Sequence, residues 1–385
     1  MGAAVNKTQG EARDERAGAG RSAPAIDTVD ARAYTIPTDQ PEADGTLEWN
    51  ATTMVIAEVR SADQTGIGYT YAHKGTAQLI ADPLRDALLG GNPLDIPALW
   101  TSMYRSLRNV GCPGMGLMAI SAVDHALWDL KGKLLGCAVV DLLGRCRPAV
   151  PVYGSGGFTS YSIKQLQQQL SGWVAEGIPR VKMKVGTNPA ADPGRVRAAR
   201  EAIGEDARLM VDANGAYTRK QALALAADFA GHDVCWFEEP LSSRDLDGLR
   251  LMRDRAPAGM DIAAGEYGWG VDYFRHMLQA GAVDTLQIDS TRCGGFTGFL
   301  QCAAVAHGFD IPVSAHCAPL LHAHVCSAVP RLEHLEYFHD HVRIESMFFE
   351  GLPVLHEGAL QVDAGRPGLG VTLKRQDVER YRVDA

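Results

Sequence analysis

The 385-residue sequence lacks the features of membrane proteins, of disulfide-rich secreted proteins and of nucleic-acid-binding proteins. It contains no uninterrupted apolar run long enough to span a bilayer. Its eight cysteines form no CxxC pair and show no regular spacing, which favours free thiols in a reducing cytoplasm over a disulfide framework or a zinc site. The formal net charge of −9 argues against nucleic acid as a partner. We therefore expect a cytoplasmic protein that needs a local positive site to bind any anionic ligand.

The length of the chain exceeds the usual size of a single core, so we expect two domains. Residues 1–24 are rich in glycine, alanine and charge, and they predict a flexible tail rather than a signal peptide. Residues 25–147 contain strand patterns followed by helix patterns, which is typical of an α+β domain. Within one of these strand patterns, TGIGYTY, we interpret Gly66 and Gly68 as bends.

The pattern changes to a strict alternation of strands and helices over residues 148–352. Most gaps between the short apolar runs are long enough to hold a helix. The eight runs are VPVYG, VKMKVG, LMVDANG, VCWFEEP, IAAGE, TLQIDS, IPVSAH and HLEYF. Eight strands alternating with helices predict a (β/α)8 barrel, because open parallel sheets usually contain fewer such units.

Ionisable residues lie at or near the ends of seven consecutive predicted strands. A single acidic strand end is usually a helix cap or a solvated turn, but seven in a row are hard to explain by capping. In a barrel, the carboxyl ends of the strands meet at one mouth, where catalytic groups lie. The sequence therefore predicts that these residues form one site: Lys182 and Lys184, Asp212, Glu238, Glu266, Asp289, His316 and Glu336.

The residue types indicate part of the chemistry of this site. Three consecutive strands end in the carboxylates of Asp212, Glu238 and Glu266, a ligand set that suits a hard cation such as Mg²⁺. The set includes no sulfur or imidazole, so zinc is not expected there. Asp289 and His316 end neighbouring strands, where the carboxylate can orient the imidazole as a base.

The two lysines of the RVKMKVG segment point to the same side of their strand, because side chains at i and i+2 share a face. Alone, such a pair indicates a strand end with both lysines extending to solvent. Beside the other groups, two neighbouring ammonium groups and a metal are expected to lower the pKa of a lysine toward the range of a base.

These motifs resemble those of the enolase superfamily, in particular its mandelate racemase subgroup. The matching segments are KMK (182–184), VDAN (211–214), FEEP (237–240), AGE (264–266), QID (287–289), SAH (314–316) and LEYF (335–338). The segment 119–136 is similar to the capping-domain helix of that family. The resemblance implies an N-terminal α+β capping domain (25–147), the barrel (148–352) and a C-terminal segment (353–385) that returns to the capping domain. It also implies a homo-oligomer.

The resemblance implies a mechanism in which Mg²⁺ binds a substrate carboxylate and a base removes the proton alpha to it, giving an enediolate. By position, Lys184 is the base on one face, and His316, oriented by Asp289, acts on the other. Lys182 neutralises the substrate carboxylate. Glu336, as a protonated acid, donates a hydrogen bond to the oxyanion.

Two opposed bases are compatible with two reactions. We favour dehydration of an acid sugar, an aldonate or aldarate, to a 3-deoxy-2-keto acid, and racemisation or epimerisation of a 2-hydroxy acid is the alternative. Asn214 resembles the position that contacts the alpha-hydroxyl, and Trp49 is a further candidate to bind substrate. Trp49 belongs to a predicted lid loop (37–50) whose acids suit a polyol, although exposed acids are also typical of any solvated loop: Asp39, Glu42, Asp44 and Glu48.

Three other patterns in the sequence suggest sites of a different kind. His322-x-His324 is similar to the HxH of zinc hydrolases, but it lies on a helix after the seventh strand rather than on the first strand. HDH at 339–341 follows the eighth strand and could reach the mouth, but a solvated loop is the favoured interpretation. GCPGMG at 111–116 is interpreted as a loop before a helix rather than a phosphate cradle. A non-catalytic barrel is disfavoured, because every position of the site is filled.

Overall fold

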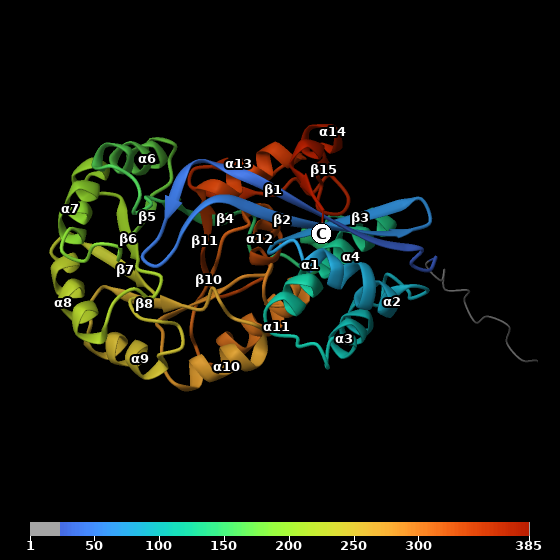
Figure 1. Ribbon diagram of the computed structural model, residues 1–385, viewed down its shortest axis with the longest axis horizontal. Coiled ribbons are helices and arrows are strands. Elements are labelled where there is room, and N and C mark those ends of the chain that lie inside the picture. Colours follow the sequence, from blue (N-terminus) through green and yellow to red (C-terminus); the bar gives the residue numbers. More distant parts are fainter. Residues whose placement is uncertain (1–23, 385) are drawn as a thin grey trace, which may run out of the picture.

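The computed structural model describes residues 24–384, so the predicted tail lies outside the described residues apart from Pro24. Figure 1 shows a ring of helices around a barrel of strands on one side and a sheet with its own helices on the other. The fold class predicted from the sequence is confirmed: a (β/α)8 barrel with an α+β capping domain. None of the helices in the described range has the length and hydrophobicity needed to cross a membrane.

An antiparallel sheet forms one layer of the capping domain. In the described chain its strand order is β16-β1-β2-β3, with bounds β1 (Thr28–Ala43), β2 (Glu48–Ser61), β3 (Gln64–Tyr71) and β16 (Arg382–Val383). The helical layer contains α1 (Thr76–Leu79), a π-helical segment η1 (Ile80–Leu84), α2 (Arg85–Leu88), α3 (Ile96–Ser106), α4 (Met115–Leu135) and α5 (Val139–Leu143).

The predicted lid loop, 37–50, is mostly strand, which corrects the sequence-based interpretation. β1 and β2 continue as a long hairpin in which Glu42 pairs with Trp49, beyond a register shift that starts at Pro37. Asp44 closes the turn by accepting hydrogen bonds from the backbone N–H groups of Thr46 (2.6 Å) and Leu47 (2.7 Å). Glu42 and Asp44 are buried rather than exposed, because their carboxylates hold the hairpin together.

The two glycines of β3 do not mark bends, as the sequence suggested, but allow a close approach of α4. A Cβ atom at Gly66 would lie 2.0 Å from the carbonyl oxygen of Ala126, and one at Gly68 would lie 2.2 Å from that of Ala122. Both distances are shorter than any tolerable contact, so a side chain at either position would push α4 away from the sheet.

Eight parallel strands close into the barrel, because β11 pairs with β4 as well as with β10. In the described residues these strands are β4 (Val150–Gly156), β5 (Arg180–Lys184), β6 (Arg208–Asp212), β7 (Val234–Glu238), β8 (Asp261–Ala264), β9 (Thr285–Ile288), β10 (Val313–Ala315) and β11 (Leu332–Phe338). The helices that follow them are α6 (Ile163–Ala175), α7 (Asp192–Ile203), α8 (Arg219–Ala230), α9 (Leu246–Arg255), α10 (Val271–Gln279), α11 (Gly295–Gly308), α12 (Pro319–Cys326) and α13 (His339–Phe348).

Alternation along the strands decides which side chains enter the barrel. On β5, Val181 and Met183 belong to the large core that the strands share with the surrounding helices. Lys182 and Lys184 therefore point to the interior, as the i, i+2 spacing predicts. Lys182 is completely buried, so the interpretation of a strand end with its lysines in solvent is wrong.

The C-terminal segment contacts both domains. Its first part contains β12 (Phe349–Glu350) and a hairpin of β13 (Val354–His356) and β14 (Ala359–Gln361), of which β14 pairs antiparallel with the start of β4. Beyond β15 (Thr372–Leu373), α14 (Arg375–Val378) and the 3₁₀ turn η2 (Glu379–Tyr381), β16 pairs with β1 and completes the capping sheet. The segment thus ties the barrel to the capping domain.

The long helix α4 is also joined to the barrel by a buried carboxyl group. Asp124 accepts hydrogen bonds from the backbone N–H (3.0 Å) and the hydroxyl (2.7 Å) of Thr297 in the first turn of α11. Burial raises the pKa of Asp124 from 3.8 to about 7. The same junction includes Ser121, whose hydroxyl accepts from the N–H groups of Gly294 and Gly295.

We expect Asp124→Ala to lower the free energy of unfolding by about 1–3 kcal/mol, because it leaves the buried donors of Thr297 unpaired. Asp124→Asn is the matched control, since it keeps one acceptor and cannot titrate. The raised pKa means that the native carboxyl holds its proton while the unfolded one loses it. The wild-type contribution is therefore full below about pH 4 and is lost as the pH rises to about 7. Urea unfolding from pH 4 to 8 measures the free energy of unfolding of the wild type and both variants. If this free energy depended on pH equally in the wild type and in Asp124→Asn, the expected titration of Asp124 would be contradicted.

Candidate active site

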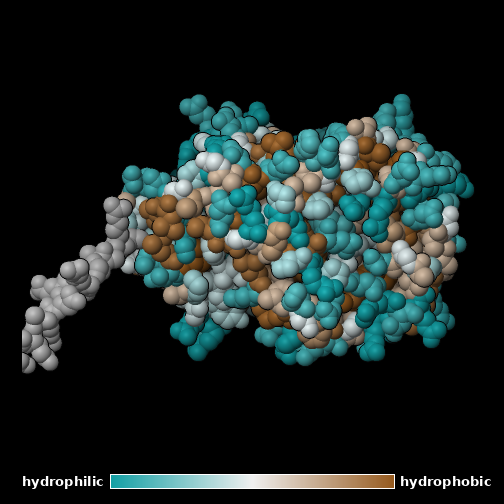
Figure 2. Space-filling model, turned by 180° about the vertical axis from the view of Figure 1, so that it is seen from behind, coloured by the Kyte–Doolittle hydropathy of each residue, from teal (hydrophilic) through white to brown (hydrophobic). Residues whose placement is uncertain are grey.

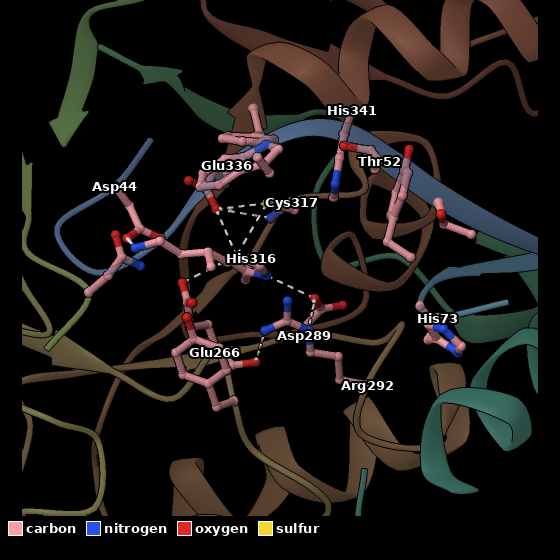
Figure 3. Close-up of a pocket in the computed structure, with 18 of the residues that line it drawn as sticks. Asp44, Thr52, His73, Glu266, Asp289, Arg292, His316, Cys317, Glu336 and His341 are labelled. Carbon is pink, nitrogen blue, oxygen red and sulfur yellow. Dashed lines mark hydrogen bonds and ion pairs between the residues drawn. The ribbon is translucent and has the colours of Figure 1, made fainter. Parts of the chain in front are cut away.

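A cavity of about 470 Å³ lies where the capping hairpin covers the carboxyl ends of the barrel strands. Figure 3 shows its lining residues converging from both domains. The capping domain contributes Asp44, Trp49, Thr52, Tyr71 and His73. The barrel contributes residues predicted from the sequence, namely Lys184, Asn214, Glu266, Asp289, His316 and Glu336.

Three of the predicted carboxylates lie together at the floor of this mouth. Asp212 and Glu238 are the last residues of β6 and β7 and are register partners, and Glu266 follows the end of β8 by two residues. All three are buried, and each offers an oxygen within 4.8 Å of the others. A single cation could contact all three.

The two lysines face these carboxylates. Lys182 Nζ lies 2.6 and 2.7 Å from the two Glu238 oxygens and 2.8 Å from Glu336 Oε1. Lys184 Nζ lies 2.5 Å from Asp212 Oδ2. The KMK pair therefore balances part of the negative charge at the end of the barrel.

The pKa of each lysine differs from the sequence-based expectation. Burial by itself lowers the pKa of Lys184, but contact with Asp212 outweighs burial and raises it above that of an ordinary lysine. The pKa of Lys182 is raised as well, because contact with Glu238 outweighs burial. The expected lowering included the charge of a bound metal; from the protein groups alone, the neighbouring carboxylates dominate over the neighbouring ammonium group.

The carboxylates still carry more negative charge than the two lysines neutralise. Burial, and then the charge of Asp212, raise the pKa of Glu238 to about 8. One oxygen of Glu266 accepts no hydrogen bond although the residue is buried. A buried site with excess negative charge and a free oxygen ligand fits a hard divalent cation.

His316 and Asp289 interact as predicted. The imidazole Nδ1 lies 2.8 Å from Asp289 Oδ2, and Nε2 points into the cavity 3.2 Å from Glu266 Oε2. Burial opposes a charged imidazole, but Glu266 and Asp289 outweigh it and raise the pKa of His316. The carboxylate of Asp289 therefore fixes the ring so that Nε2 faces the cavity.

Glu336 differs from the expected protonated acid. Burial favours its neutral form, but Lys182 reverses that effect and lowers the pKa of Glu336 well below its usual value. The carboxylate also accepts hydrogen bonds from the hydroxyl of Ser155 (2.6 Å) and the backbone N–H of Cys317 (3.1 Å). In this state Glu336 is an acceptor rather than a donor.

The two remaining predicted substrate contacts both reach the cavity. Asn214 has a left-handed backbone (φ 45°), and its buried side-chain oxygen has no hydrogen-bond partner. Trp49 lies on the hairpin, donates a hydrogen bond from Nε1 to Glu42 Oε2 (2.8 Å) and packs edge-to-face on Phe158. The unpaired oxygen and the anchored indole leave both side chains available to a ligand.

Two further residues of the cavity lie in segments that the sequence did not assign to the site. HDH at 339–341 is the start of α13 rather than a solvated loop, and His341 stacks on Tyr71 and lines the cavity, in agreement with the alternative that HDH reaches the mouth. Arg292 is held between the Tyr267 ring (5.2 Å) and the carbonyl oxygen of Glu266 (3.0 Å). Its position three residues after Asp289, in the same turn after β9, is the one signal that could have identified it.

The zinc interpretation of His322 and His324 gains no support. Both are buried in α12, and His322 Nε2 accepts a hydrogen bond from the backbone N–H of Ser290 at 2.8 Å. Within residues 24–384, neither imidazole belongs to a group of three or more side chains able to hold one ion. GCPGMG leads into α4 as predicted, and its last two residues form the start of that helix.

Similarity to known proteins extends over both domains. Residues 35–144 match the model of the mandelate racemase/muconate lactonizing enzyme N-terminal domain, and residues 165–378 match that of the enolase C-terminal domain-like family. A solved mandelate racemase/muconate lactonizing enzyme-like protein from Rubrobacter xylanophilus is 53% identical, with a TM-score of 0.92 over 94% of this chain and 100% of that one.

Two further relatives carry names of activities. The L-talarate/galactarate dehydratase of Salmonella typhimurium is 34% identical over 84% of this chain and 81% of its own. An L-talarate dehydratase from a Polaromonas species, solved with Mg and L-glucarate, is 30% identical, with a TM-score of 0.84 over 94% of this chain and 98% of that one. With the barrel, the cap and the convergent carboxylates, these matches establish that the chain belongs to the mandelate racemase/muconate lactonizing enzyme family of the enolase superfamily.

Proposed function

We propose that the protein is a Mg²⁺-dependent dehydratase that converts an acid sugar, an aldonate or aldarate, to a 3-deoxy-2-keto acid. The observation that carries this proposal is the placement of Lys184 and His316 in one cavity beside three buried carboxylates. Relatives named as dehydratases of such acids, and one solved with Mg and L-glucarate, support the same reaction.

Asp212, Glu238 and Glu266 would hold the Mg²⁺. When bound, the ion supplies positive charge that favours the ionised carboxylate and the enediolate derived from it. Their buried oxygens, one of them free of any hydrogen bond, are the donor set that such an ion takes. Lys182 would add a second positive charge for the substrate carboxylate.

The protein side chains would carry the protons. Lys184 Nζ accepts the proton alpha to the carboxylate, and His316 Nε2, held by Asp289, acts on the opposite face. The carbon–oxygen bond at the beta position then breaks, and the hydroxyl leaves as water with a proton from the imidazolium. The enol product tautomerises to the 2-keto acid. Lys184 has to be neutral to accept its proton, so its 2.5 Å contact with Asp212 has to weaken when substrate and ion are bound.

Three further residues would bind the substrate. The unpaired side-chain oxygen of Asn214 suits a hydroxyl group of the substrate. Trp49 would cover the sugar chain from the hairpin. Glu336, held ionised by Lys182, would have to take up a proton before it could donate a hydrogen bond to the oxyanion.

Racemisation or epimerisation of a 2-hydroxy acid remains the second candidate, because bases on two faces can also return the proton to the other face. Proton NMR in D₂O with Mg²⁺ separates the two reactions. For a panel of aldonic, aldaric and aryl 2-hydroxy acids, we expect loss of the alpha signal together with a new 3-deoxy-2-keto product. Loss of the alpha signal with an intact carbon skeleton would establish a racemase or epimerase, and no exchange with any acid would contradict both candidates.

We also propose that the chain forms a homo-oligomer in the cytoplasm. Figure 2 shows hydrophobic residues gathered beside the start of the described chain, at the capping-domain end. Large apolar side chains exposed in that domain include Leu89, Tyr104, Val110, Met115 and Leu135. Sedimentation of the purified chain as a monomer at micromolar concentration would contradict the oligomer. The eight free thiols support a reducing compartment.

A further inference from the structure

A second group of side chains that can serve as metal ligands lies in the cavity, next to the carboxylates already described. It consists of His316 Nε2, Cys317 Sγ and Glu336 Oε2, all buried and all lining the cavity. The group differs from the first in its chemistry, because it combines sulfur, nitrogen and oxygen. Such a mixed set is typical of ligands for a borderline-soft cation such as Zn²⁺ rather than for Mg²⁺.

The distances within this group agree with the geometry of a tetrahedral zinc site. Zinc lies about 2.0–2.3 Å from nitrogen, oxygen and sulfur ligands, so tetrahedral ligand atoms are about 3.3–3.8 Å apart. In the structure, Sγ lies 3.2 Å from His316 Nε2 and 3.3 Å from Glu336 Oε2, and Nε2 lies 3.7 Å from Oε2. The three atoms need only small shifts to bind one ion.

The backbone at the end of β10 holds the thiol in this position. Cys317 has a left-handed backbone (φ 54°), as does the following Ala318 (φ 41°), an arrangement that costs energy for residues other than glycine. The backbone N–H of Cys317 donates a hydrogen bond to Glu336 Oε2 at 3.1 Å. The thiol therefore faces two potential acceptors, although its single proton can satisfy only one of them.

A fourth oxygen is available beside the group. Glu266 Oε2 lies 3.2 Å from His316 Nε2, is buried and accepts no hydrogen bond. Glu266 also belongs to the carboxylate group proposed for Mg²⁺, so the two sites are adjacent. In Figure 3, Cys317, His316 and Glu336 are linked by dashed lines, with Glu266 on the far side of the imidazole.

We propose that His316, Cys317 and Glu336 form a second metal site that binds Zn²⁺, or a similar thiophilic divalent cation, and blocks the active site. Binding replaces the thiol proton by the metal and releases that proton to solvent. The ion occupies the lone pair of His316 Nε2, so the imidazole can no longer act on a substrate proton. The binding itself does not depend on the proposed function, whereas inhibition of turnover rests on it.

Co²⁺ provides a direct probe, because a thiolate ligand gives Co²⁺ a near-ultraviolet charge-transfer band. The protein is first saturated with Mg²⁺ and then titrated with Co²⁺. We expect the band in the wild type, its loss when Zn²⁺ displaces Co²⁺, and its absence in Cys317→Ser. Cys146→Ser is the matched control, since Cys146 is exposed and does not line the cavity, and it should keep the band. Unchanged thermal unfolding of both variants verifies that they are folded.

Turnover of the acid sugar identified by NMR supplies the second measurement. Zn²⁺ should inhibit the wild type even at saturating Mg²⁺. Cys317→Ser should keep its turnover. It should need a Zn²⁺ concentration at least about 10–100-fold higher for half inhibition, because the loss of a residue that only hydrogen-bonds to a metal ligand already lowers metal affinity by that factor. A missing band in the wild type, or a band that persists in Cys317→Ser, would overturn the site. So would inhibition that excess Mg²⁺ relieves equally in both proteins, because Zn²⁺ would then occupy the carboxylate group. If no acid is turned over, the proposed function fails while the Co²⁺ band still tests the site.

Discussion

Replacing Lys184 with alanine is expected to abolish dehydration while leaving exchange of the alpha proton through His316. A positioned base contributes on the order of 10²–10⁴-fold to a rate, so turnover should fall by that factor. His316→Asn should give the complementary result, with exchange through Lys184 alone. The reason is geometric, because the two groups reach the same cavity from different strands, β5 and β10. Proton NMR in D₂O measures exchange and product formation in the same sample.

The folded state of these variants has to be verified, because Lys184 also balances the charge of Asp212. Lys184→Arg serves as the matched control, since it keeps the charge beside Asp212 but is too basic to accept a proton at neutral pH. It should unfold like the wild type and still lack turnover. Full turnover in both Lys184→Ala and His316→Asn would refute the assignment of two bases.

The second large effect is expected for Glu238→Gln, which should remove the dependence on Mg²⁺ together with activity. In the wild type, Mg²⁺ at about 100 times its Kd should stabilise the folded protein by about 2.7 kcal/mol. In the variant this stabilisation should disappear, because one of three oxygen ligands loses its charge. The measurement is thermal unfolding with Mg²⁺ and with EDTA, alongside turnover.

Glu238→Gln should change the stability of the metal-free protein little at neutral pH. The pKa of Glu238 is raised to about 8, so its carboxyl group is already mostly neutral there, as glutamine is. Lys182 also keeps its contact with Glu336 at 2.8 Å. Glu333→Gln, at the opposite end of the barrel on β11, is the control and should keep both the Mg²⁺ response and activity. An unchanged response to EDTA in Glu238→Gln would show that the ligand group is misassigned.

The sequence by itself determined that the chain forms a barrel and which ionisable residues lie at its mouth. Strand periodicity and the intervals between strands are local properties, and a closed barrel brings the ends of its strands together whatever the details of packing. For this reason the sequence alone groups Asp212, Glu238, Glu266, Asp289 and His316 in one site. The inward direction of Lys182 and Lys184 followed in the same way from the two-residue period of a strand.

Only the tertiary structure decided which other side chains line the cavity. Gly66 and Gly68 looked like bends because their role depends on α4, more than fifty residues away in the chain. His341 and Cys317 carry no distinctive signal, since a polar turn and a lone cysteine are common in sequences without a site. The contribution of the capping hairpin depends on how two domains dock.

The charge states of the site were likewise decided by tertiary contacts. The sequence placed two lysines side by side and suggested a lowered pKa beside a metal. Among the protein groups, the pKa of Lys184 is raised by Asp212 on the neighbouring strand and that of Lys182 by Glu238, two strands away. Glu336 was expected to be protonated, and Lys182 keeps it ionised. Electrostatic energy depends on distances of a few ångströms between residues far apart in the chain, and only the folded structure sets those distances.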